Sequence, residues 1–282
     1  MKVLILFGRE QLLFWTNLLL LAGVCLVCSL FLWLATGDGE VTFSAYVDAL
    51  PVVFAQACAA ILIGLMLSIN MVSKDYAMLR RELRMGISAG TLVMAKTLLI
   101  ILSCAIMSLI LILPYLVGLI NVEGRNLFYF YVAIFFPMFA SAQLGLCISS
   151  LSSFFRSNRL KKIAFAIPFV MLYQILFSGF VFEQVQIDLL HRISISNYAI
   201  RMIGGALRFN VEYYRGTAFI WETPTGRASG HGAFGLKFFD ADTGIDIGHI
   251  IETMSVLILF AVLAILISVV VLNRVGQKGF DE

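Results

Sequence analysis

Residues 73–90 read SKDYAMLRRELRMGISAG and separate two long apolar stretches of the chain. The charged residues of this segment are Lys74, Asp75, Arg80, Arg81, Glu82 and Arg84. A charged side chain at the centre of a bilayer costs about 3 kcal/mol, so a segment with this many charges lies in water. We therefore predict that the chain enters a membrane on both sides of residues 73–90.

The same segment predicts a short amphipathic helix. Ser73 is a suitable N-cap, and Asp75 falls in the first turn, where an acidic side chain is favourable. Apolar residues at helical spacing form one stripe, namely Tyr76, Leu79, Leu83 and Ile87. Arg80, Arg81 and Arg84 crowd the rest of the surface and repel one another. Two interpretations remain open: a helix that docks onto a partner molecule, and a positive anchor that contacts lipid phosphates.

The composition indicates an integral membrane protein, because 61% of the residues are hydrophobic and only 13% are charged. Six stretches lack Asp, Glu, Lys and Arg, and each is long enough for the ~20 residues that a helix needs to cross a bilayer. A transmembrane barrel would show shorter, alternating segments, so we predict helices. The predicted spans are residues 12–35, 51–72, 97–119, 127–151, 163–182 and 251–272. The predicted fold is thus all-α, a single transmembrane domain over residues 1–282, with short external helices before the last span.

The positions of Lys and Arg predict the orientation of these spans. Basic residues precede the first span, follow the last, and fill the connections after the second and fourth spans, whereas the other short connections are mainly acidic. Because basic residues stay in the cytoplasm, both termini are predicted to be cytoplasmic and residues 183–250 extracytoplasmic. The net charge of +3 is therefore a signal of topology and gives no reason to expect a nucleic-acid partner.

Two spans carry a face of small or weakly polar residues at intervals of four. In the second span these are Gln56, Ala60, Gly64 and Ser68, and in the fourth Ser141, Gly145 and Ser149. Small residues at this spacing let two helix backbones approach closely, which favours helix association in lipid. Close packing is the favoured interpretation, and the lining of a cavity is the alternative.

Residue patterns for a metal or catalytic site are weak. Cys25 and Cys28 form a CxxC inside an apolar span without a neighbouring His or acid, which favours packing over redox or metal chemistry. The acidic turn around Asp240, Asp242 and Asp246 lacks the closing Glu of a calcium loop. We expect no metal ligands and no catalytic residues in this chain.

The predicted spans also disfavour several transport classes. Carriers driven by proton or sodium gradients normally have an ionisable residue near the middle of a span. None of the predicted spans has one. The chain has no GxxxxGK[ST] loop for ATP. If the protein moves a substrate uphill, another polypeptide must supply the energy, and residues 73–90 are the main cytoplasmic structure that could receive it.

Two segments resemble type-2 ATP-binding-cassette (ABC) permeases, especially the branch shared with the G subfamily. In SINMVSKDYAMLRRELRMGISAGTLVMAK, residues 68–96, the matching positions are Arg81, Glu82, Gly86, Ala95 and Lys96. In ILFSGFVFEQVQIDLLHRISISNYAIR, residues 175–201, they are Gly179, Phe180, Ser196, Tyr198 and Ala199. The resemblance implies a dimer of six-helix units, with a second permease copy or a paralogue, in contact with membrane lipid. Each unit would sit on a separate ABC ATPase subunit, which binds the ATP and magnesium, so this chain itself would need no cofactor.

The resemblance also implies roles for residues. Those expected to contact the ATPase are Tyr76, Leu79, Arg80, Arg81, Glu82, Leu83, Arg84 and Gly86, with the apolar side chains in a groove and the charged ones at its rim. The expected substrate path, between spans two and five of both copies, is lined by Phe54, Gln174, Phe177 and Phe180, an aromatic surface suited to a lipid-like, peptide or hydrophobic drug substrate. The competing hypothesis is a membrane scaffold or sensor whose external segment binds a ligand. A passive channel is a third, weaker alternative.

Overall fold

A computed structural model of the chain describes residues 46–69, 71–73, 76–116, 124–154, 159–178, 193–206, 221–223, 226–228 and 247–278. The helices are α2 (Tyr46–Ser68), α3 (Tyr76–Arg84), α4 (Ala89–Leu116), α5 (Gly124–Phe154), α6 (Arg159–Leu176), α8 (Ile195–Ala206) and α10 (Ile247–Lys278). The predicted first span, residues 12–35, and most of residues 183–250 lie outside the described part of the chain. So does Phe180, one of the residues expected along the path.

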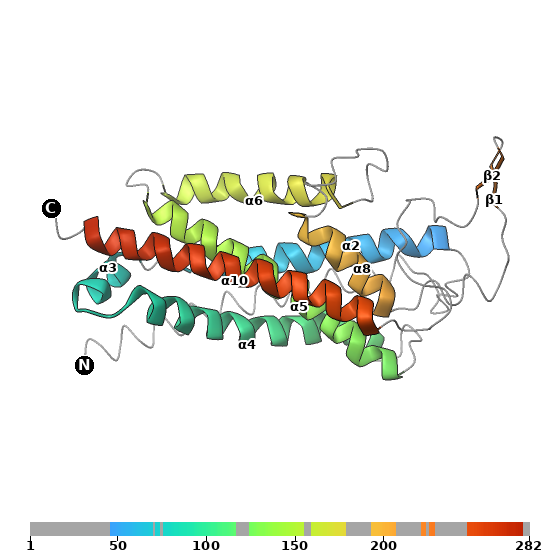
Figure 1. Cartoon of the computed structure of the whole chain (residues 1–282), viewed down its shortest axis with the longest axis horizontal. Helices are drawn as coiled ribbons and strands as arrows, with labels where there is room; N and C mark the ends of the chain where they lie inside the picture. The colour runs from blue at the N-terminus through green and yellow to red at the C-terminus, as the bar shows by residue number, and fades with distance from the viewer. Residues whose placement is uncertain are drawn as a thin grey trace.

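The long helices form a bundle whose members run along its longest dimension (Figure 1). α5 is central, because it packs against α2, α4, α6, α8 and α10. The short helix α3 lies at one end of the bundle and contacts α10. α8 lies in the segment where the sequence predicts short external helices, and it packs against α2, α5 and α10.

Among the residues that the structure describes, three helices are long and apolar enough to cross a membrane. Their apolar stretches are Ala89–Leu113 in α4, Leu127–Ser152 in α5 and Ile251–Arg274 in α10. At 1.5 Å per residue, the 28 residues of α4 extend about 42 Å, more than the ~30 Å hydrocarbon core. α2 and α6 contain shorter apolar stretches, Val53–Ser68 and Ala166–Leu176. Each helix overlaps a span predicted from the sequence.

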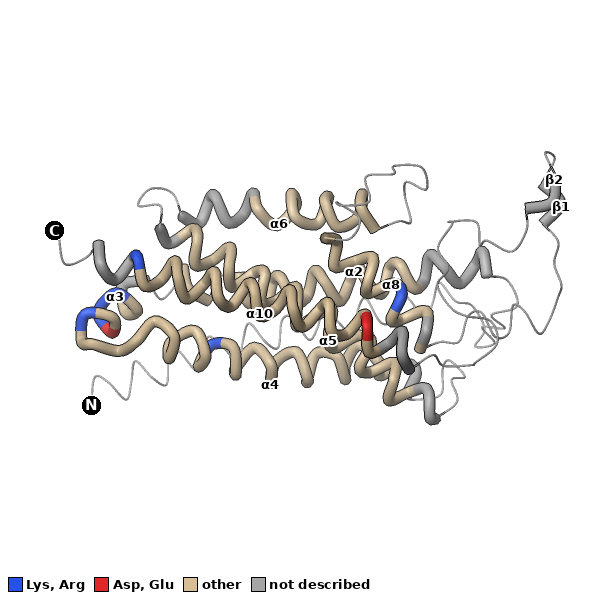
Figure 2. The backbone as a smooth tube through the Cα atoms, in the orientation of Figure 1, with Lys and Arg blue, Asp and Glu red and all other residues tan. Residues whose placement is uncertain are grey.

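Charges and exposed apolar side chains are distributed as a membrane requires. Figure 2 shows the basic residues of α3 and of the final part of α10 at one end of the bundle. Beside them, α10 has a long stretch without Lys, Arg, Asp or Glu. α4 and α10 each expose an apolar face; Leu98 is 68% exposed and Leu259 58%. In lipid such a face costs nothing, whereas in water it would be a large unfavourable surface.

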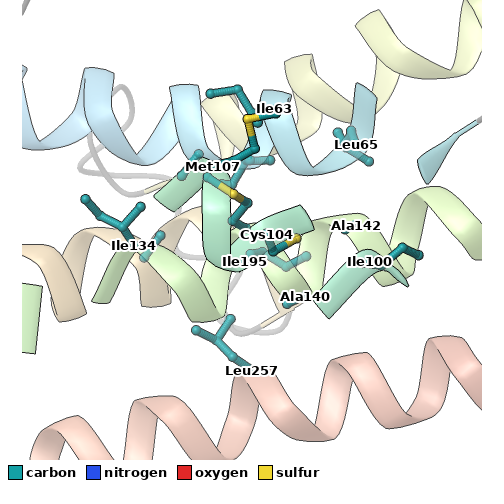
Figure 3. Packing of buried hydrophobic residues seen from close by; sticks show 14 of the residues in the cluster. Ile63, Leu65, Ile100, Cys104, Met107, Ile134, Ala140, Ala142, Ile195 and Leu257 are labelled. Atoms are coloured by element: carbon teal, nitrogen blue, oxygen red, sulfur yellow. The ribbon is translucent and has the colours of Figure 1, made fainter. Parts of the chain in front are cut away.

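The buried core is built from α2, α4, α5, α8 and α10, and Leu79 of α3 joins it. Figure 3 shows Ile63 from α2, Cys104 and Met107 from α4, Ile134 from α5 and Leu257 from α10. Serine hydroxyls in the core donate to carbonyls of their own helix, as in Ser150 to Leu146, Ser141 to Met138 and Ser268 to Ala264. These bonds satisfy the hydroxyls without a second helix, so polar residues can occupy the interior.

Several predicted boundaries need correction. The helix predicted over residues 73–90 covers only Tyr76–Arg84, because the chain turns at Gly86, and Ile87 therefore does not extend its apolar stripe. The helix of the second span ends at Ser68 instead of continuing to residue 72, since residues 69 and 71–73 form turns. Helix α6, within the fifth predicted span, ends at Leu176 and is followed by a turn at residues 177–178.

Two short strands interrupt the otherwise helical architecture. β1 (Trp221–Thr223) and β2 (Gly226–Ala228) form an antiparallel hairpin in which Trp221 pairs with Ala228 and Thr223 with Gly226. The hairpin lies within residues 183–250, the segment that the sequence predicts to be extracytoplasmic. The fold class predicted from the sequence, an all-α membrane protein, otherwise describes the structure.

Candidate functional site around helix α3

Helix α3 presents one side to the bundle and the other to solvent. Leu79 is only 2% exposed and belongs to the hydrophobic core, and Leu83 is half-buried against that core. Arg81 and Arg84 are exposed, as is Met78 at 42%. The apolar stripe therefore anchors α3 to its own chain, and Leu79 in particular is not accessible to another molecule in this conformation.

The exposed side of α3 is positively charged. Arg80 and Glu82 are half-buried, whereas Arg81 and Arg84 extend into solvent at the C-terminal end of the helix. Basic side chains at this end are stabilised by the partial negative charge of the helix dipole. The result is a compact basic surface beside the end of α10 (Figure 2). Of Tyr76, the structure describes the backbone alone.

A glycine ends α3. Gly86 has φ of 91°, the left-handed region that residues with a Cβ rarely adopt. Its N–H donates to the Leu83 carbonyl at 3.2 Å, and the Ile87 N–H donates to the Glu82 carbonyl at 3.2 Å. This pair of bonds is a Schellman motif, which satisfies the last carbonyls of a helix and reverses the chain. Gly86 therefore acts inside the chain by fixing where α3 stops.

Ser88 starts the next helix two residues later. The Ser88 Oγ accepts a hydrogen bond from the Thr91 N–H at 3.2 Å and contacts the Thr91 Oγ1 at 2.7 Å. This is the N-cap arrangement, in which a side chain satisfies a free N–H of the first turn. The end of α3 and the start of α4 are thus joined by a short, well-defined corner.

The turn that precedes α3 is bound by two other helices. The backbone N–H groups of Val72 and Ser73 both donate to the Ser149 Oγ of α5, each at 3.1 Å. The Lys96 Nζ of α4 donates to the Met71 carbonyl at 2.8 Å. Hydrogen bonds thus hold both the glycine corner after α3 and the turn at residues 71–73 that precedes it.

Comparison with known protein families decides the identity of the chain. The model of the family described as ABC-2 type transporter matches residues 1–207, which include α2 to α8. The chain belongs to the ABC-2 type transporter family. A search of curated proteins finds no match. ABC-2 domains are the membrane components of ABC transporters and work with ATPase partners, so this chain is a membrane-embedded permease component.

The small residues of the permease lie where α2 meets α5. A Cβ added to Gly64 would overlap the Ser141 Oγ and the Met138 carbonyl, and one added to Gly145 would overlap the Ser68 Oγ. Gln56 and Ala60 of α2 are fully buried, as is Ser149 of α5. The structure thus brings the two faces together, at a distance that only glycine permits at two positions.

The described residues expected to line the path lie on α2 and at the end of α6. Phe54 is half-buried on α2, and Phe177 lies in the turn after α6 with its ring 5.0 Å from that of Tyr173. Gln174 is 3% exposed, and its Oε1 accepts bonds from the Ser194 hydroxyl at 3.1 Å and from the Ser196 N–H at 2.9 Å. In this conformation the Gln174 amide therefore joins α6 to the start of α8.

Three residues of the permease make contacts that have no clear signal in the sequence. Ser149 belongs to a face of small residues, and nothing in that pattern indicates that its hydroxyl binds a turn 77 positions away. Lys96 and Gln174 likewise bind partners that only the tertiary structure brings close. Among the described residues, no group of three His, Cys, Asp or Glu is placed to hold a metal ion.

Proposed function

We propose that this permease is a subunit of an ABC exporter and that a separate ATPase subunit drives it through α3. The observation that carries the proposal is the orientation of α3, which anchors Leu79 in the bundle and exposes Arg81 and Arg84 at one end of it. A helix held firmly from one side and charged on the other is suited to transmit a force from a bound partner. Charged partners on the ATPase would form charge-assisted hydrogen bonds with the arginines.

The docking surface in this proposal is the solvent-facing side of α3 and the corner after it. Arg81, Arg84 and Met85 are exposed there, and Met85 is 64% exposed. Arg80, Glu82 and Leu83 border the surface and are half-buried. A basic rim around flexible methionine side chains fits an acidic groove with apolar walls. Tyr76 is proposed to extend this surface, and Gly86 shapes its edge.

The whole transporter is proposed to be a dimer of such permeases. Each would cross the membrane six times, with both termini and α3 in the cytoplasm and residues 183–250 outside. Phe54, Gln174, Phe177 and Phe180 are proposed to line the path between the two copies. Since the Gln174 amide binds α8, opening of the outer part of this path would require that its bonds with Ser194 and Ser196 break.

Exchange of the exposed arginines on α3 tests the proposal. Arg81→Glu together with Arg84→Glu reverses the charge of the docking surface without touching the buried Leu79. We expect the double variant to reach the membrane in normal amount and to lose its ATPase subunit on purification in mild detergent. Mass spectrometry of the purified complex would identify that subunit, and its rate of ATP hydrolysis would confirm it.

The control is Arg274→Glu, which reverses an exposed charge at the same end of the bundle but on α10. It should retain the ATPase subunit. If the double variant on α3 copurified with a normal amount of ATPase and supported normal export, the proposed role of α3 would be wrong.

A further inference from the structure

The turn between α2 and α3 is bound by side chains at three successive residues. Met71 offers its carbonyl to the Lys96 Nζ at 2.8 Å, and the N–H groups of Val72 and Ser73 share the Ser149 Oγ at 3.1 Å each. Backbone groups after the end of a helix normally bond to water or to their own chain. Here three of them, the Met71 carbonyl and the N–H groups of Val72 and Ser73, bond to side chains of other helices.

The surroundings make these bonds strong and specific. Val72 and Ser149 are both fully buried, so water cannot replace the hydrogen bonds between them. The Lys96 ammonium is half-buried, and it lies at the C-terminal end of α2, where the helix dipole is negative. A charged donor on a carbonyl in this position is favoured by both effects.

Little chain separates this turn from α3. Only residues 74 and 75 lie between Ser73 and Tyr76, so at full extension the two Cα atoms are at most about 11 Å apart. A movement of α3 that would draw Tyr76 farther than this from Ser73 must therefore move the turn. Because the turn is bonded to Ser149 and Lys96, the displacement must then move α5 and α4 or break the bonds.

We infer that Ser149 and Lys96 are positioning residues that pass the movement of α3 to α5 and α4. This inference rests on the proposed function, because it requires that an ATPase subunit moves α3. It adds a route by which the movement reaches α5, the helix that packs against most of the bundle. In this account α3 acts on α5, a span distant in sequence, as well as on α2 and α4, its neighbours along the chain.

The first variant is Ser149→Ala, which removes the shared acceptor of Val72 and Ser73. Ser150→Ala is the matched control, since Ser150 is equally buried on the same helix and its hydroxyl donates to the Leu146 carbonyl of that helix. The second pair is Lys96→Met, which keeps the length of the side chain and removes the donor, with Lys96→Arg to restore a donor. The second pair also guards against failure of Ser149→Ala to fold.

The experiment uses the complex of the permease with its ATPase subunit in lipid nanodiscs, with native cysteines replaced. Spin labels at Met78 on α3 and Leu151 on α5, both exposed, report the distance between the two helices. In the wild type and in Ser150→Ala, we expect the same distance without nucleotide and in the trapped ATP-bound state, because the two helices move together. In Ser149→Ala, which frees the turn from α5, we expect the distance to change on ATP binding. In Lys96→Met, which frees the turn from α4 alone, we expect a change in the rate of ATP hydrolysis.

ATP hydrolysis supplies a readout that loss of stability alone would not move. We expect the Ser149→Ala complex to stay assembled, while its hydrolysis rate shifts about tenfold from that of the wild-type complex towards that of the isolated ATPase subunit. Lys96→Arg should restore the wild-type rate. An unchanged distance in Ser149→Ala, together with unchanged hydrolysis rates in both Ser149→Ala and Lys96→Met, would overturn this inference alone. A wild-type permease that binds no ATPase subunit would overturn the proposed function and the inference with it.

Discussion

Gly64 and Gly145 let α2 and α5 approach closely, and a side chain at either position would meet atoms of the other helix. We expect Gly64→Ala and Gly145→Ala to destabilise the permease by about 1–3 kcal/mol through overpacking, despite the higher helix propensity of Ala. Gly90→Ala is the control, because a Cβ there meets only the Ser88 Oγ at 3.9 Å. Thermal unfolding in detergent, followed by fluorescence, measures all three. Equal stability of the three variants would contradict the close contact.

A buried amide on α5 offers a second prediction at this scale. Gln143 is fully buried, and neither its Nε2 nor its Oε1 has a hydrogen-bond partner within the described residues. A buried amide without partners costs about 1–3 kcal/mol, so Gln143→Met should raise the midpoint of thermal unfolding. Gln174→Met should lower it, because the Gln174 Oε1 accepts bonds from Ser194 and Ser196. A fall in the midpoint for Gln143→Met would show that the amide has a partner, for instance a buried water.

Sequence patterns predict which helix faces pack together, but not which groups a buried side chain binds. Spacing by four places Gly64, Ser68, Ser141 and Gly145 on helix faces, and the faces do meet in the structure. The same pattern says nothing of what the Ser149 hydroxyl binds, since its partners lie on a turn 76 and 77 positions away. Side-chain chemistry is local, but the choice of partner depends on tertiary structure.

The stability of helix α3 depends on the capping motif at its C-terminal end as much as on its apolar stripe. Gly86 adopts φ of 91°, so Gly86→Ala should cost about 1 kcal/mol in the corner between α3 and α4. We expect faster amide hydrogen exchange at Met85, Gly86 and Ile87, whose N–H groups donate to carbonyls of α3. A substitution that left exchange unchanged would argue against the motif.

Ser88→Ala should loosen the start of α4 by a similar amount, because it removes the N-cap.

The positions of the long helices follow from the sequence, whereas their ends do not. Stretches free of charge predict α4, α5 and α10, since burial in lipid excludes charge over the whole thickness of the bilayer. The spacing does not reveal the break at Gly86, because an apolar residue at position 87 continues the helical pattern through a glycine that turns the chain. A single backbone angle thus overrides the pattern of side chains.

At the scale of the whole molecule, the family match and the apolar helices establish a membrane component of an ABC transporter. The orientation remains a prediction from charge, and it can be tested by labelling single cysteines in intact cells. Glu252→Cys near the start of α10 should react with a membrane-impermeant thiol reagent, whereas Met85→Cys should react only after the membrane is permeabilised. Reaction of Met85→Cys in intact cells would reverse the predicted topology.

The central claim is that α3 contacts a subunit that hydrolyses ATP. A cysteine at Met85, which is 64% exposed beside Arg84, tests this contact most directly through a bifunctional thiol-reactive crosslinker applied to native membranes. The account predicts one main adduct, whose second component contains a Walker ATP-binding motif and whose yield changes when ATP is added. An adduct that contains only a second permease, a kinase or no protein at all would contradict it.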